Sequence, residues 1–143
     1  MTFLKLYVTL LTMKRKTLTT CLDIALKNNT PEKHPQWDYY HHYSFVIQRE
    51  KIVDWGTNRG ASPLTNFGYA DYTKMHSEPD AYFKAKGIMD KSLPFEVVNV
   101  RLTRTNRIAI STPCKCCSAF LKNMGCKRIW FSTNIENFAC ITF

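Results

Sequence analysis

The feature that most constrains the fold of this chain is a pair of short motifs, His76-Ser77-Glu78-Pro79 and Pro113-Cys114-Lys115-Cys116-Cys117. Together they read H-x-E followed by P-C-x-x-C. One imidazole and two thiolates fill three of the four tetrahedral positions that zinc prefers, and the fourth position can hold a water whose pKa falls to roughly 7. The sequence therefore predicts a zinc site whose ligands are His76, Cys114 and Cys117, in a fold that brings the two motifs together.

The position of Glu78 separates a catalytic zinc site from a structural one. Glu78 lies two residues after His76, beside the metal without being needed as a ligand, where it can take a proton from water and pass it on. A structural site would normally have a fourth Cys or His ligand, for which Cys116, Cys126 and His42 are available. A glutamate at this spacing has no role in a structural site. The pattern therefore favours a catalytic centre with Glu78 as the catalytic residue.

These two motifs are those of the zinc nucleobase deaminases, and over residues 15–143 the sequence resembles the cytidine deaminase-like superfamily. The resemblance implies a hydrolase that acts on the C–N bond of a cyclic amidine, with Zn²⁺ as cofactor. It also implies that Glu78 deprotonates the zinc-bound water, protonates the ring nitrogen (N3 of cytosine) and moves a proton to the departing amine. Most members have Ala where this chain has Ser77, a departure that does not touch the chemistry.

The length and composition predict one folded domain. The chain has 143 residues, of which 45% are hydrophobic and 13% aromatic, enough to form a real core. We expect residues 1–14 to be an N-terminal extension, as an extra strand or a loosely attached arm, and residues 15–143 to form a single zinc deaminase domain. The apolar run in residues 1–12 is too short to span a membrane, and its positive charges follow it, unlike those of a signal peptide.

The cysteines indicate the compartment. The sequence contains six, of which two are assigned to zinc, and the other four show no paired spacing. We therefore expect a reducing, cytoplasmic location instead of a disulfide-stabilised secreted protein.

Hydrophobic periodicity predicts helices alternating with strands. Helices are expected over residues 15–28 and 78–86 and from Thr112-Pro113-Cys114 to about residue 123. Strands are expected at residues 43–49, 52–56, 95–104, 127–133 and 138–143, with 106–111 continuing the third strand after a bend. Residues 134–137 are too few for a parallel crossover, so the last two strands must form an antiparallel hairpin. Together with the resemblance, this predicts an α/β fold with three α-β-α layers and a mixed five-stranded sheet.

Four residues are the expected substrate contacts: Asn58, Arg59, Thr112 and Tyr72. In the superfamily a G-x-N segment ends the second strand and its Asn commonly reaches the sugar of the nucleotide, which places that role on Asn58. An Asn is equally favoured in a turn, where it tolerates left-handed geometry, and both interpretations stay open. Arg59 can meet a phosphate, Thr112 directly precedes the Pro-Cys motif, and Tyr72 is a loop aromatic that can stack on a base or close the pocket wall.

The substrate is less constrained than the chemistry. A net charge of +9 favours polyanionic partners, either nucleotides or nucleic acid, although a basic surface kept for solubility is a competing explanation. The C-terminal hairpin resembles free-cytidine and several toxin-type deaminases more than the tRNA adenosine deaminases or antiviral polynucleotide deaminases. The charge and the loop aromatics favour cytosine in single-stranded DNA or RNA. The alternatives are a free cytidine or deoxycytidine nucleoside or nucleotide, and a non-catalytic zinc-containing nucleic-acid-binding module.

Partners follow from the same reasoning. We expect a nucleotide or single-stranded nucleic acid substrate and no membrane partner. A homo-oligomer is a further expectation, because several members of the superfamily complete their pockets across a subunit interface.

Overall fold

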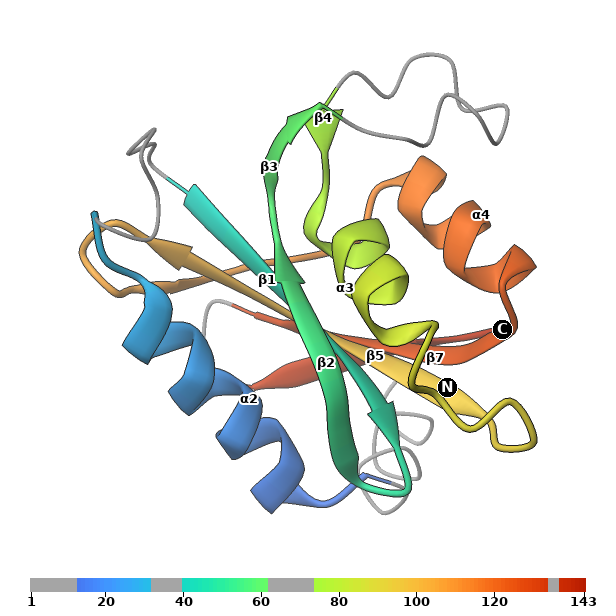
Figure 1. Cartoon of the computed structure of the whole chain (residues 1–143). Coiled ribbons are helices and arrows are strands. Elements are labelled where there is room, and N and C mark those ends of the chain that lie inside the picture. The colour runs from blue at the N-terminus through green and yellow to red at the C-terminus, as the bar shows by residue number, and fades with distance from the viewer. Residues whose placement is uncertain (1–12, 32–39, 62–73, 134–136) are drawn as a thin grey trace.

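A mixed β-sheet lies between one helix on one face and two helices on the other (Figure 1). This computed structural model describes residues 13–31, 40–61, 74–133 and 137–143. In these residues the main sheet has six strands, in the order β2-β1-β5-β7-β8, with β6 paired to β5. Among the described strands of this sheet, only β5 and β7 pair in parallel. The predicted three-layer α-β-α fold with a mixed sheet is therefore confirmed.

The elements fall close to the residues expected from the sequence. The helices and the strands of the main sheet are α2 (Arg15–Asn28), α3 (Ser77–Ala85), α4 (Lys115–Asn123), β1 (Tyr40–Gln48), β2 (Lys51–Thr57), β5 (Phe95–Thr103), β6 (Ile108–Ala109), β7 (Cys126–Ser132) and β8 (Phe138–Thr142). β7 and β8 pair antiparallel, which is the hairpin that the short connection requires. Among the described residues, no helix is long and apolar enough to cross a bilayer.

Two features differ from the expectation. Residues 106–111 do not continue β5, because the chain reverses at Asn106, whose φ of 64° is left-handed, and β6 then pairs antiparallel with β5. The sheet consequently has six strands instead of five. In addition, β3 (Arg59–Ala61) and β4 (Lys74–Met75) form a separate two-stranded sheet that leads into α3.

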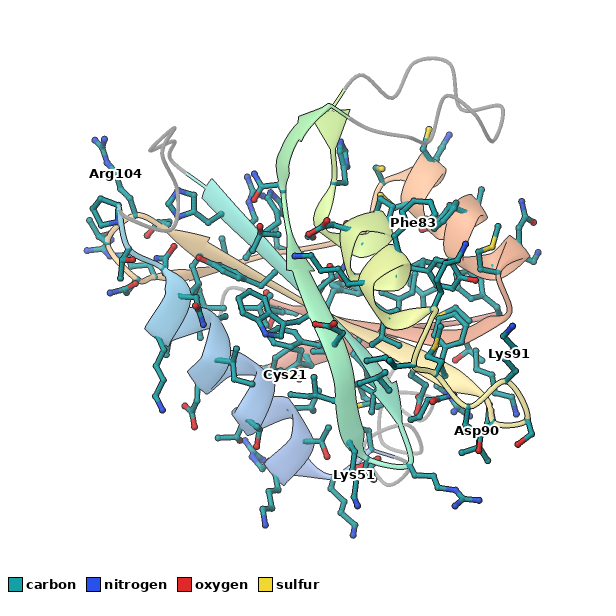
Figure 2. All side chains as sticks on the ribbon, in the orientation of Figure 1. Cys21, Lys51, Phe83, Asp90, Lys91 and Arg104 are labelled. Atoms are coloured by element: carbon teal, nitrogen blue, oxygen red, sulfur yellow. The ribbon has the colours of Figure 1, made fainter. Side chains whose placement is uncertain are left out.

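The core has two parts, one on each face of the sheet. On the first face, α2 buries Leu18, Cys21 and Ala25 at helical spacing against strand residues such as Phe45. Cys21 is labelled on this helix in Figure 2. Met13, within the expected N-terminal extension, is also fully buried in this part of the core.

The second part of the core lies beneath α3 and α4. Val46, Val97 and Ile129 come from three neighbouring strands and face Phe120 of α4. Phe83 of α3, labelled in Figure 2, has its ring centroid 5.6 Å from that of Phe120. These contacts hold the two helices side by side on one face of the sheet (Figure 1).

Helix α3 lies unusually close to β2, and Gly56 makes this possible. A Cβ atom at Gly56 would lie 2.4 Å from the backbone N of Ala81 and 2.6 Å from Oδ2 of Asp80. The same Asp80 oxygen accepts a hydrogen bond from the backbone N–H of Thr57 at 3.0 Å. The absent side chain and this bond together set the position of α3, which carries the first motif.

Candidate active site

The two motifs meet at the N-termini of α3 and α4. His76 is the N-cap residue of α3 and Cys114 is the N-cap residue of α4. The Sγ of Cys114 accepts a hydrogen bond from the backbone N–H of Cys117 at 3.4 Å. The positive end of a helix dipole favours a thiolate, so α4 is suited to present both sulfurs in their ionised form.

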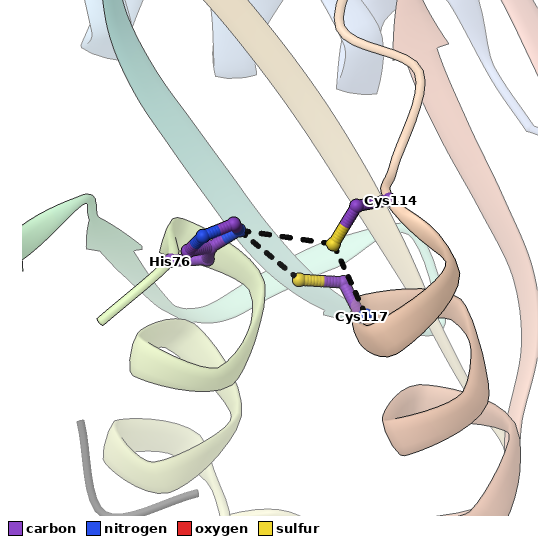
Figure 3. A group of neighbouring side chains, drawn as sticks. All are labelled: His76, Cys114 and Cys117. Carbon is purple, nitrogen blue, oxygen red and sulfur yellow. Dashed lines mark hydrogen bonds between the residues drawn. The ribbon is translucent and has the colours of Figure 1, made fainter. Parts of the chain in front are cut away.

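The three donor atoms have the spacing that a tetrahedral zinc ion requires. The Nδ1 of His76 lies 3.8 Å from the Sγ of Cys114 and 3.6 Å from the Sγ of Cys117 (Figure 3). Zn–S and Zn–N bonds of about 2.3 and 2.05 Å at a tetrahedral angle would place nitrogen and sulfur about 3.6 Å apart. The donor set and its geometry therefore fit zinc.

The fourth coordination position has no protein ligand among the candidates from the sequence. In the described part of the chain, the one group of His, Cys, Asp and Glu side chains able to hold an ion consists of His76, Cys114 and Cys117. Cys116 is partly buried and packs against the core beneath α3 and α4, and the Sγ of Cys126 donates to the backbone carbonyl of Arg128. Because Cys114 is exposed, an ion held here would be reachable from solvent, as a catalytic site requires.

Glu78 lies in the first turn of α3 and is only 6% exposed. Its Oε2 accepts from Nδ2 of Asn99 at 3.1 Å, and its Oε1 accepts from Oγ of Ser77 at 3.2 Å. Burial raises the pKa of the Glu78 carboxyl above its ordinary value, and the nearby charge of Cys114 adds to the rise. A carboxyl group in this environment is suited to exchanging protons with a reactant.

The four residues expected to contact the substrate differ in where they lie. The side-chain Oδ1 of Asn58 accepts from the backbone N–H of His42 at 3.0 Å, so it joins the end of β2 to β1, and contact with a sugar stays a prediction. Arg59 begins β3, and Thr112 is exposed two residues before Cys114. Tyr72 lies outside the described residues.

The strands contribute four polar residues to this face, of which sequence reasoning considered His42 and missed the other three. Ser44 of β1 pairs with Asn99 of β5, and His42 pairs with Arg101 two residues further along each strand. All four share the face of the sheet beneath α3, because side chains alternate along a strand. The available signal for Asn99 was a polar residue within the otherwise apolar run VVNV of residues 97–100.

His42 and Arg101 are close to each other at the edge of the site. The pKa of His42 is lowered to about 4 by burial first and by the charge of Arg101 second, so the imidazole is neutral at pH 7. The Nη1 of Arg101 donates to the backbone carbonyl of Ile110 at 3.1 Å. Arg101 thus places a positive charge on the same face of β5 as Asn99, two residues further along the strand.

Comparison with known proteins identifies the fold. No protein-family model and no curated protein matches the chain. The solved cytidine deaminase from Burkholderia pseudomallei is similar, with 14% identity, a TM-score of 0.54, and coverage of 91% of this chain and 93% of that one. The chain therefore shares the fold of this cytidine deaminase, which is the fold that the resemblance implied.

Two further structures with this fold are of the dCMP deaminase from the cyanophage S-TIM5. The apo form has 16% identity and a TM-score of 0.51, and covers 82% of each chain. The complex with dCMP and dUMP also has 16% identity, with a TM-score of 0.53 and coverage of 82% of this chain and 81% of that one.

Proposed function

We propose that this protein is a zinc-dependent hydrolytic deaminase that converts cytosine to uracil. The observation that carries the proposal is the arrangement of His76, Cys114 and Cys117 at zinc-ligand distances with the buried Glu78 held by its own hydrogen bonds. A structural zinc site would have no use for a buried carboxyl group that hydrogen-bonds to other residues beside the donors. An open site with an adjacent acid–base residue is what hydrolysis at a ring carbon requires.

The reaction can be assigned to the residues of the chain. His76, Cys114 and Cys117 would hold the zinc ion, which would supply a Lewis acid and would lower the pKa of water at the open position. Glu78 takes one proton from the attacking water and gives it to N3 of the cytosine ring. It then carries the second proton of that water to the amino group, which leaves as ammonia. The oxygen of the water remains on the ring as the new carbonyl oxygen of uracil.

Single-stranded nucleic acid is the substrate class that we favour. The net charge of +9 supports a polyanion, because lysine and arginine side chains gain affinity by displacing the counterions of the phosphates. Arg101, on the site-facing side of β5 beyond Asn99, adds a positive charge where a phosphate next to the reacting base can lie. An exposed site at helix termini also leaves room for a strand to enter.

A free nucleotide is the second candidate. It is favoured by the fold, which this chain has in common with a dCMP deaminase whose structure was solved with dCMP and dUMP. The same Arg101 charge would serve the phosphate of a monomer. None of the six cysteines, all of which lie in the described residues, forms a disulfide, which is in keeping with the proposed intracellular, reducing location.

The deciding experiment compares substrates on zinc-loaded protein. Cytidine, dCMP, and cytosine-containing single-stranded DNA and RNA are assayed side by side for uracil and ammonia at two salt concentrations. Turnover of the strands that falls steeply with salt would support the polynucleotide proposal, and turnover of the monomers alone would support the nucleotide alternative. Zinc-loaded protein that binds strands but deaminates none of these substrates would overturn the enzymatic proposal in favour of a binding module.

A further inference from the structure

Four buried polar side chains form a closed ring beside the candidate metal site. Nδ2 of Asn99 donates to Oε2 of Glu78 at 3.1 Å, and Oγ of Ser77 donates to Oε1 of Glu78 at 3.2 Å. Oγ of Ser44 donates to Oδ1 of Asn99 at 2.7 Å. It also lies 2.8 Å from Oγ of Ser77, which closes the ring as a contact only, because both hydroxyl protons are already donated. The ring therefore joins β1, β5 and α3 through side chains alone.

The side chains of the ring are almost entirely buried. Ser44, Ser77, Glu78 and Asn99 have exposed fractions of 0%, 1%, 6% and 3%. On one side, the neighbouring pair on the same face of the two strands is Val46 and Val97, which belong to the apolar core. Burying a polar group costs free energy unless the group is hydrogen-bonded. The side chains of the ring therefore favour the arrangement in which each keeps its hydrogen bonds.

The ring also fixes the orientation of the Asn99 amide. Because the hydroxyl of Ser44 donates to Oδ1, the carbonyl end of the amide faces β1 and the Nδ2 end faces Glu78. A carboxylate can only accept hydrogen bonds, so this orientation gives Glu78 a donor where the reverse orientation would give it a second acceptor. Ser44 thus acts on Glu78 through Asn99.

From this ring we infer that Asn99 is a positioning residue for Glu78, and that Ser44 keeps Asn99 in the required orientation. The inference rests on the proposed deaminase function. A Glu side chain in the first turn of a helix has three rotatable bonds, and contacts to both carboxyl oxygens from α3 and β5 hold it in one position. A catalytic group needs its geometry held within about 0.5 Å, and Asn99 adds a contact from β5 to the contacts that α3 itself supplies.

Activity measurements on zinc-loaded variants test this role. Asn99→Ala is expected to lower kcat by about 10- to 100-fold, the usual cost of losing a supporting hydrogen bond, with KM changed less than about twofold. Ser44→Ala should lower kcat by a smaller factor. The matched control is Asn29→Ala, which removes another buried Asn near the end of α2. Its side chain donates a hydrogen bond to the backbone carbonyl of Thr103, and the variant should keep kcat within about twofold of wild type.

A double-mutant cycle separates positioning from general destabilisation. If Asn99 acts through Glu78, adding Asn99→Ala to Glu78→Gln should cost no further activity. Full multiplication of the two losses would overturn the inference. Asn99→Val, which suits a strand, replaces Asn99→Ala if the alanine variant does not fold.

A structural measurement keeps the inference separate from the proposed function. In a crystal structure of zinc-loaded Asn99→Ala, the Glu78 carboxyl should occupy a new or multiple position, while His76, Cys114 and Cys117 stay in place. An unmoved carboxyl would refute the positioning role even if wild-type protein deaminates cytosine. Absence of deamination by wild type together with a displaced carboxyl would refute the proposed function and leave the contact between Asn99 and Glu78 standing.

Discussion

Replacing Gly56 with alanine is expected to push α3 away from β2 and to disturb the fold and the metal site together. The new Cβ would lie 2.4 Å from the backbone N of Ala81 and 2.8 Å from the carbonyl carbon of Asp80. Because both are backbone atoms, no change of rotamer relieves the clash. Restoring van der Waals contact requires α3 to move by about 1 Å.

The cost follows from that displacement. Overpacking a well-packed site costs about 1–3 kcal/mol, and we expect the upper end, about 3 kcal/mol, because a shift of α3 also weakens the bond from Thr57 to Asp80. For a domain of this size about 1 kcal/mol corresponds to about 2–4 °C in Tm, so Tm should fall by about 6–12 °C. Because α3 carries His76, zinc affinity should fall by at least about 10-fold.

The matched control is Gly87→Ala, where an added Cβ would meet no atom within 4 Å. Thermal unfolding of the zinc-free proteins measures the stability, and competition with a chromophoric chelator measures the zinc affinity. Gly87→Ala should match wild type in both. If Gly56→Ala unfolds at the wild-type temperature and binds zinc as tightly as wild type, the account of how α3 is positioned is wrong.

Two further predictions concern the cysteines. Cys117→Ser should lower zinc affinity by more than about 100-fold because a ligand is lost. Cys116 lies one position off the metal-facing side of α4, so Cys116→Ser should still bind one zinc per chain by native mass spectrometry. Equal zinc loss in both variants would contradict the ligand set. In alkylation of native zinc-free protein, the exposed Cys114 should react first and be protected by added zinc. Cys126, whose pKa burial raises to about 12, should stay unmodified, and its rapid labelling would contradict its buried position.

Elements set by local sequence were predictable. The first helix was expected over the residues that form α2, because Leu18, Cys21 and Ala25 recur at helical spacing. The β7–β8 hairpin followed from the length of the connection alone. The grouping of His76 with Cys114 and Cys117 was predictable because motif spacing places the two cysteines one helical turn apart, where both sulfurs can face one ion.

Features set by strand register were not predictable. Ser44 and Asn99 meet only because β1 and β5 pair in one register, and a shift of one residue would place both on the opposite face. The reversal at Asn106 depends on a left-handed residue that the polar sequence permits but does not require. The hydrogen bond from the His42 backbone to Asn58 likewise depends on tertiary contact between strands.

The central claim is that Glu78 and the zinc ligands form one catalytic centre, and turnover by Glu78→Gln tests it most directly. Zinc-loaded wild type and Glu78→Gln are assayed on a cytosine substrate, with zinc content measured in the same samples. Wild type is expected to give equal amounts of uracil and ammonia, and Glu78→Gln a rate lower by about 10²- to 10⁴-fold while still holding one zinc per chain. Wild-type turnover by Glu78→Gln, or by protein stripped of zinc, would contradict the central claim.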